Sequence, residues 1–150
     1  MAKVLITGGA YQGKYRYARD HYPIIDENCI NFQEIENRIG KNENSRDNLP
    51  DMICQKVSVN HMICFTHCHL LVKWAVKSEI DIIDLWESIC DRVCQSGDWC
   101  VIMDEIGGGI IPLDRFEREY REKAGIFGCY IAGKSDEVVR VICGIGSRIK

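Results

Sequence analysis

The chain has 150 residues, of which 46% are hydrophobic and 27% charged, and its formal net charge is −3. This length predicts a single domain, residues 1–150, whose core needs no disulfide or metal. No apolar run approaches the ~20 residues of a membrane-spanning helix, and the mild acidity gives no general attraction to nucleic acid or to an anionic membrane.

The nine cysteines are predicted to be reduced thiols. Their number is odd, and the opening MAKVLITGG is typical of a first core strand and not of a cleaved signal peptide. We therefore expect a cytoplasmic protein in which the cysteines pack as small hydrophobic side chains.

The chain begins with a predicted strand (residues 3–7), a glycine loop and a helix (residues 14–20). The loop GGAYQGKY follows the pattern G-x-x-x-x-G-K-[ST] until its last position, where Tyr15 replaces a small hydroxyl residue. In such a loop the backbone N–H groups and the helix N-terminus bind phosphate, and the lysine adds a positive charge. A glycine-rich turn beside a surface lysine is the alternative. The predicted nucleotide-binding residues are Gly8, Gly9, Ala10, Gln12, Gly13, Lys14 and Tyr15.

The middle of the chain is less regular. Residues 22–25 are predicted as a second short strand, residues 32–39 as an amphipathic helix that ends at Gly40, and the polar residues 40–51 as a surface loop. Residues 61–66 are predicted as a strand. The segment HMICFTHCH, residues 61–69, contains cysteine and histidine, the residue types that bind zinc. No second pair of such ligands follows at the spacing of a structural zinc site, so we favour a core strand and helix over a metal site.

Stronger patterns follow. Residues 78–95 are predicted to form a helix that ends before Gly97. Residues 99–103, WCVIM, are predicted to form a strand that is covered on both faces. Strands covered on both faces are typical of parallel sheets. A charged helix is predicted to open at Pro112, with Asp114 in its first turn, and to end at Gly125; residues 138–143 form the last predicted strand. The alternation predicts a three-layer α/β domain. The helical face of residues 78–95 consists of Ile82, Trp86, Ile89 and Val93.

Two acids follow the WCVIM strand. Nucleotide-binding folds place the carboxylate that holds Mg²⁺ at such a strand end, so Asp104 is the predicted metal ligand, and Lys14, Asp104 and Glu105 are the predicted catalytic residues. The glycines at 107–109 free the next loop to approach a ligand, and Gly107 and Gly109 are added to the predicted nucleotide site. An acidic surface loop and an ordinary turn are the alternatives.

The segments VIMDEIGGGIIPLDRFEREYREKAG, AGKSD and VVRVICGIGSRIK, together with ITGGAYQGKY, resemble the adenosylcobinamide kinase/adenosylcobinamide-phosphate guanylyltransferase family. The resemblance covers about residues 2–19 and 99–150. It implies a RecA-like P-loop fold, a homotrimer, ATP or GTP with Mg²⁺, and phosphorylation of the aminopropanol hydroxyl of adenosylcobinamide, followed by GMP transfer through a guanylylated histidine. It also implies that the glycine loop holds phosphates and that Glu105, Gly107 and Gly109 belong to the family's N-E-V-G-x-G loop, with Asp104 in the Asn position.

Four departures from the family pattern bear on activity. Tyr15 replaces the loop hydroxyl, the family's strand-end acid is missing from HMICFTHCH, and GIFGC at 125–129 replaces the family's G-x-x-N-Q. The histidine that accepts GMP also has no recognisable counterpart among His21, His61, His67 and His69. The sequence therefore predicts a cobinamide kinase that binds a purine nucleotide or, alternatively, a nucleotide- or partner-binding relative without turnover.

Overall fold

The computed structural model describes residues 2–39, 49–54, 57, 60–94 and 97–150. Strands of these residues form a six-stranded sheet in the order β2-β3-β4-β1-β5-β6. The pairs of neighbouring strands are parallel except β5 and β6, which are antiparallel. The strands are β1 (Lys3–Gly8), β2 (Cys29–Asn31), β3 (Ile63–Thr66), β4 (Trp99–Asp104), β5 (Glu137–Ile142) and β6 (Ile145–Arg148).

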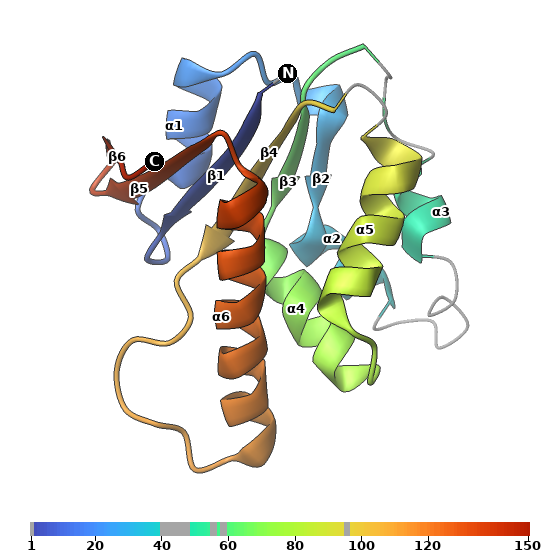
Figure 1. Ribbon diagram of the computed structural model, residues 1–150, viewed down its shortest axis with the longest axis vertical. Coiled ribbons are helices and arrows are strands. Elements are labelled where there is room, and N and C mark those ends of the chain that lie inside the picture. The colour runs from blue at the N-terminus through green and yellow to red at the C-terminus, as the bar shows by residue number, and fades with distance from the viewer. Residues whose placement is uncertain (1, 40–48, 55–56, 58–59, 95–96) are drawn as a thin grey trace.

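Helices cover both faces of the sheet, with α1 on one face and α4, α5 and α6 on the other (Figure 1). Among the residues described, no helix is both long and apolar enough to cross a membrane. The helices are α1 (Lys14–His21), the 3-10 helix η1 (Asp26–Asn28), α2 (Phe32–Ile39), α3 (Leu49–Cys54), α4 (Cys68–Lys77), α5 (Ile82–Val93) and α6 (Arg115–Lys134).

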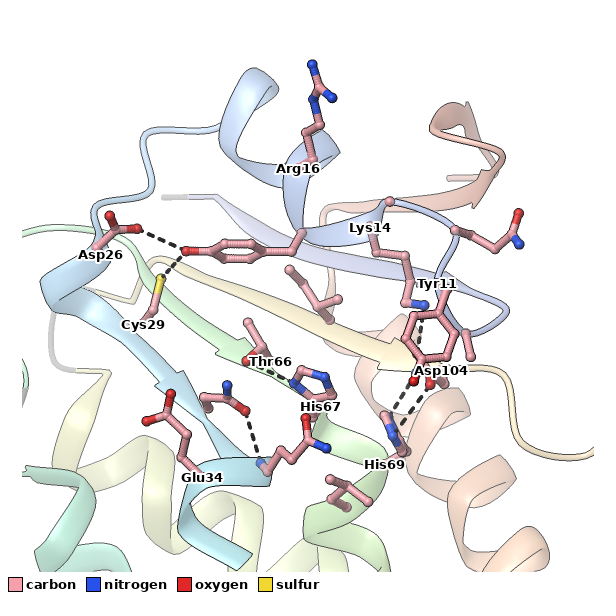
Figure 2. A pocket seen from close by; sticks show the side chains of 18 of the residues that line it. Tyr11, Lys14, Arg16, Asp26, Cys29, Glu34, Thr66, His67, His69 and Asp104 are labelled. Carbon is pink, nitrogen blue, oxygen red and sulfur yellow. Dashed lines mark hydrogen bonds and ion pairs between the residues drawn. The ribbon is translucent and has the colours of Figure 1, made fainter. Parts of the chain in front are cut away.

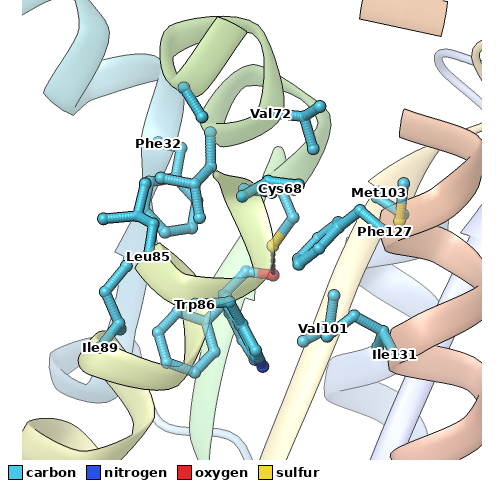
Figure 3. Close-up of a cluster of buried hydrophobic side chains, with 14 of the residues drawn as sticks. Phe32, Cys68, Val72, Leu85, Trp86, Ile89, Val101, Met103, Phe127 and Ile131 are labelled. Carbon is cyan, nitrogen blue, oxygen red and sulfur yellow. Dashed lines mark hydrogen bonds between the residues drawn. The ribbon is translucent and has the colours of Figure 1, made fainter. Parts of the chain in front are cut away.

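The core lies in two layers because the side chains of a strand alternate between its faces. In β1, Val4 and Ile6 pack toward α1, whereas Leu5 packs toward the larger group of helices. In that larger layer, which Figure 3 shows between α5 and α6, the Trp86 ring lies 5.6 Å from the ring of Phe127, centroid to centroid. This packing fixes the sheet and therefore the relative positions of its carboxyl ends.

The predicted fold class is confirmed: the domain has three layers and a mainly parallel sheet. The predicted helix over residues 32–39 has those bounds in the structure, and the predicted strand over residues 99–103 is β4, extended by one residue. The whole predicted apolar face of residues 78–95 is buried in α5. In each case a strong apolar pattern, periodic in the helices and continuous in β4, indicated the element.

Other boundaries differ. Residues 22–25 are not a strand: Ile24 is buried, but Pro23 lacks an N–H, and the second strand begins only at Cys29. Gly40 and most of the predicted loop lie outside the described residues, and the end of that loop is wrong because α3 begins at Leu49.

The C-terminal third also differs from prediction. Helix α6 does not end at Gly125 but continues to Lys134, and Asp114 precedes the helix as its N-cap, accepting a hydrogen bond from the Glu117 N–H. The last predicted strand ends at Ile142 and turns back as β6, which the sequence reading missed.

Candidate functional site

A cavity of about 1020 Å³ opens where the carboxyl ends of β1, β2, β3 and β4 meet. Ligands of open parallel sheets bind at this edge. The cavity is lined by the loop between β1 and α1, by η1 and β2, by the start of α2, by the junction of β3 and α4 and by the end of β4. It therefore collects residues from four separate parts of the chain.

The glycine loop enters this cavity in a conformation that needs glycine at two positions. Gly8 has φ 153°, and a Cβ there would lie 2.4 Å from the carbonyl oxygen of Val141. Gly13, the N-cap of α1, has φ 84°. Both conformations lie in the region that L side chains rarely adopt. The two glycines thus let the chain turn back under the sheet edge and start the helix.

Gln12 ties the loop to the turn between β5 and β6. Its side-chain Oε1 accepts a hydrogen bond of 2.7 Å from the Cys143 N–H, and its carbonyl oxygen accepts one of 2.8 Å from the Gly144 N–H. The antiparallel pair β5–β6, which the sequence reading missed, therefore holds the loop from behind.

Lys14 is the first residue of α1 and is almost buried, with 7% of its surface exposed. Its Nζ donates to the Gly9 carbonyl oxygen at 2.5 Å and lies 2.7 Å from Oδ1 of Asp104. Figure 2 shows this side chain reaching across from α1 to the end of β4. The predicted pair of lysine and strand-end acid is thus in direct contact, at the end of the glycine loop where α1 begins.

Tyr15 points to the other side of the cavity. Its hydroxyl donates to Oδ1 of Asp26 at 3.1 Å and lies 3.4 Å from Sγ of Cys29. Asp26 also forms an ion pair of 3.1 Å with Arg19, whose guanidinium lies 6.0 Å from the centre of the Tyr15 ring. Figure 2 places Asp26 and Cys29 on the opposite side from Lys14 and Asp104.

These contacts further disfavour ionisation of the Tyr15 phenol, which is already neutral at pH 7. Burial, with the hydrogen bonds to Cys29 and Asp26, raises its pKa. A neutral phenol anchored to Asp26 does not replace the hydroxyl that a Ser or Thr at this position presents beside the phosphates. Residue 15 is therefore a wall of the cavity in this chain.

Two histidines complete the site. The Nδ1 of His69 accepts a hydrogen bond of 3.1 Å from the Asp104 N–H, and its Nε2 lies 3.6 Å from Oδ2 of the same residue. Burial lowers the pKa of His69 to about 4, although the Asp104 carboxylate opposes the shift. His69 is therefore neutral at pH 7, with its proton on Nε2. Its neighbour His67 also lines the cavity, with the two ring centroids 5.8 Å apart.

The segment of residues 61–69 is a strand end and a helix start, as the sequence reading favoured: Ile63 and Phe65 are core residues and α4 begins at Cys68. Among the residues that the structure describes, no three His, Cys, Asp or Glu side chains are grouped to hold a metal ion. What the sequence reading missed is that His67 and His69 face the predicted nucleotide loop.

Glu105, Gly107 and Gly109 were predicted at the site but do not line the cavity. The Glu105 carboxylate is held by Arg140 on β5, through bonds of 2.8 and 2.9 Å. The loop after it is fastened to α6 by Arg121, which donates to the Gly107 carbonyl oxygen. The Glu105 N–H donates to the Gly8 carbonyl oxygen at 2.9 Å, so Glu105 lies beside the glycine loop while its carboxylate is turned toward Arg140.

The opposite end of the cavity contains polar residues that the sequence reading did not select. Asn31 ends β2, Thr66 ends β3, and Glu34 belongs to the first turn of α2. Parallel strands end at one edge of a sheet, so the residues that follow each strand could have been selected from the sequence. The prediction failed for β2, which has only three residues, because the second strand was predicted at residues 22–25.

A model of the cobinamide kinase / cobinamide phosphate guanyltransferase family matches residues 4–149. The bifunctional adenosylcobalamin biosynthesis protein CobU of Salmonella typhimurium is 27% identical over 179 residues, covering 98% of this chain and 99% of the relative. The protein of the same name from Escherichia coli is 25% identical with the same coverage. The match extends through the middle of the chain, where the motif resemblance stopped, and the aligned length exceeds 150 residues because the relatives have segments that this chain lacks. The chain belongs to the cobinamide kinase / cobinamide phosphate guanyltransferase family.

Proposed function

We propose that this protein is a kinase that transfers the γ-phosphoryl group of ATP or GTP to the aminopropanol hydroxyl of cobinamide. The observation that carries the proposal is the position of Lys14, whose ammonium group lies under the glycine loop between the Gly9 carbonyl and the Asp104 carboxylate. Family membership supplies the acceptor. A phosphoryl transfer needs mainly positioning and charge neutralisation, which this arrangement can provide.

The triphosphate end of the cavity is the N-terminus of α1. The backbone N–H groups there are directed at the loop, and the first turn of the helix contains no acidic residue that would repel an anion. When a phosphate enters, Lys14 exchanges Asp104 and Gly9 for phosphate oxygens. Because Lys14 is already buried, little additional desolvation opposes this exchange.

The acceptor end of the cavity lies toward β2 and α2. The cavity volume, about 1020 Å³, is at the upper limit of the roughly 300–1,000 Å³ of ordinary ligand pockets, so a nucleotide leaves room for part of a second substrate. The lining there is uncharged or acidic, with Asn31, Gln33 and Glu34. These groups suit an acceptor that carries amides and hydroxyls better than a second anion.

Mg²⁺ would be held from one side only. Asp104 is the acidic residue of the lining that touches Lys14, and its carboxylate becomes available when the lysine turns to phosphate. The Tyr15 hydroxyl is engaged by Asp26, and the Glu105 carboxylate by Arg140. A magnesium ion there neutralises phosphate charge during the transfer. The donor set fits the ion through Asp104, its water ligands and the nucleotide.

The second candidate is a relative that binds nucleotide without turnover, which the loss of the loop hydroxyl at Tyr15 favours. The relatives are named bifunctional, but the second activity, GMP transfer, is not part of our proposal because this chain has no histidine recognised as the GMP acceptor. The homotrimer implied by the motif resemblance remains a prediction that sedimentation can check.

The test has two steps. ATP and GTP are titrated into the protein with and without Mg²⁺, and phosphate transfer to cobinamide is then followed by mass spectrometry. Lys14→Met keeps the apolar stem and removes the charge; we expect nucleotide affinity to fall about 10- to 150-fold, because a charge-assisted contact contributes roughly 1.5–3 kcal/mol. Lys77→Met is the matched control, since Lys77 lies on α4 and pairs with Glu36. Nucleotide binding without transfer would establish the second candidate, and equal affinity in both variants would overturn the phosphate site.

A further inference from the structure

His67 has an unusual backbone at the point where β3 meets α4. It has φ 57° and ψ 40°, the left-handed conformation, and is the N-cap of α4 without a side-chain capping bond. A non-glycine residue adopts this conformation at an energetic cost. Residues held in such strained conformations are concentrated at functional sites. In this structure His67 lines the cavity, and its side chain makes no capping hydrogen bond to α4.

The ring of His67 is oriented by its neighbour. Nδ1 lies 3.4 Å from Oγ1 of Thr66, a side chain that is 6% exposed at the end of β3. When Thr66 accepts the Nδ1 proton, the neutral ring carries its lone pair on Nε2. The Nε2 atom has no hydrogen-bond partner among the residues described, so it remains available to a ligand in the cavity.

A chain of contacts connects this ring to the phosphate lysine. The His67 ring lies 5.8 Å from that of His69, the His69 Nε2 lies 3.6 Å from the Asp104 carboxylate, and the carboxylate lies 2.7 Å from the Lys14 Nζ. Figure 2 shows His67 between this group and Glu34 at the acceptor end. His67 is therefore located between the expected positions of the two substrates.

Titratable side chains of the neighbouring elements line the cavity together with His67. Lys14 on α1 and Asp104 at the end of β4 form an ion pair, and Glu34 on α2 lines the same cavity. His69 on α4 stays neutral at pH 7 because burial lowers its pKa to about 4, so it adds no positive charge beside His67.

We propose that His67 is the general base of the phosphoryl transfer, a role that rests on the proposed kinase function. Nε2 of His67 accepts the proton of the acceptor hydroxyl as its oxygen forms a bond to the γ-phosphorus. The bond between that phosphorus and the bridging β,γ-oxygen breaks, and the nucleoside diphosphate leaves with the electron pair. The imidazolium then releases its proton to water, and Thr66 acts as the positioning residue that selects the tautomer.

The test compares His67→Gln and His67→Glu with the unmodified protein. Gln retains polarity but does not titrate, so kcat should fall about 10²- to 10⁴-fold while the dissociation constant for ATP changes less than about twofold. Glu supplies another base and should recover part of the rate, with the acidic limb of the pH profile moved to lower pH because a carboxylate is a weaker base than an imidazole. Thr66→Val should lower kcat less than His67→Gln does and shift that limb.

His61→Gln is the matched control, because His61 is exposed and lies outside the cavity lining. Transfer at an unchanged rate and with an unchanged pH profile in His67→Gln overturns the general base and leaves the kinase function standing. A covalent adduct mapped to His67 by intact-mass analysis also overturns it, because the residue is then a nucleophile. Absence of transfer in the unmodified protein, with His61→Gln equally inactive, overturns the kinase function and the base together.

Discussion

Replacing Tyr15 by serine tests how the altered loop handles its metal ion. A serine oxygen is one bond from Cβ and can reach an ion beside Asp104, whereas the Tyr15 hydroxyl is held by Asp26 on the other side of the cavity. We therefore expect the affinity of the unmodified protein for ATP to change less than about threefold when Mg²⁺ is removed. In Tyr15→Ser the same removal should weaken binding about tenfold or more, since one added ligand contributes on the order of 1.4 kcal/mol.

The substitution also destabilises the fold. The hydrogen bond from the Tyr15 hydroxyl to Asp26 contributes about 1 kcal/mol at a partly exposed position, and the contact of Arg19 with the ring about 0.5–1 kcal/mol. Loss of ring packing adds a similar amount, so Tyr15→Ser should lower the free energy of unfolding by about 2–3 kcal/mol. For a domain of this size this corresponds to a decrease in Tm of roughly 4–12 °C.

Tyr15→Phe is the matched control for both effects. It removes the hydroxyl and retains the ring, so it should cost about 1 kcal/mol of stability and leave the weak magnesium dependence unchanged. Calorimetric titration of ATP in excess Mg²⁺ and in EDTA measures the metal effect, and thermal unfolding measures stability. Strong magnesium dependence in the unmodified protein, with no change in Tyr15→Ser, would refute this account of the loop.

The remaining predictions concern packing and thiols. Gly8→Ala should prevent native folding or strongly destabilise it, because its Cβ would lie 2.4 Å from the Val141 carbonyl oxygen, whereas in Gly9→Ala the nearest atom is 3.5 Å away; circular dichroism compares the two. Phe127→Ala should lower the free energy of unfolding by about 3–5 kcal/mol in urea titrations and the half-buried Phe116→Ala by clearly less, and equal losses would contradict the packing described. Protein unfolded without reductant should titrate as nine thiols, since the eight cysteines that the structure describes are free; a clearly lower count would reveal a disulfide.

The error at Gly125 shows where local signals mislead. A glycine inside a helix costs about 1 kcal/mol relative to alanine, which suggested a helix end. The apolar spacing continues beyond it, however, with Phe127 and Ile131 fully buried in α6. Burial of each such side chain contributes about 1.5–3 kcal/mol, so tertiary packing outweighs the glycine. The helix end was predictable only by weighing the two terms together.

The direction of the Glu105 carboxylate, away from the cavity, follows from strand geometry. Successive side chains of a strand point to opposite faces, so adjacent acids at its end do not both face one ligand. Asp104 pairs with Gly8 in the register of β4 with β1 and reaches Lys14, whereas Glu105 reaches Arg140 on β5. Period-two alternation was available in the sequence and favours one acid over the pair.

The conformation of the glycine loop, with its lysine at the start of a helix, was predictable because the glycines, the lysine and the helix start lie within one short segment. The histidine side of the site was not predictable in this way. His67 and His69 meet the loop only because β3 lies next to β4 and β4 next to β1, an order that depends on long-range pairing. Residues that a fold brings together from separate strands carry no signal in their spacing.

Asp104 joins the two halves of the site, and this has an energetic consequence. Its carboxylate holds Lys14 through Oδ1 and lies near His69 through Oδ2, while its backbone N–H fixes the ring of His69. An apolar replacement of a buried ion pair is often neutral or stabilising, so the contact of Lys14 with Asp104 is weak evidence for a role in stability. What it does provide is a desolvated cation at a cavity wall, held by a partner that a phosphate can replace. Nucleotide binding would then exchange one carboxylate contact for phosphate contacts and release Asp104 toward a metal ion, with the imidazoles already in place.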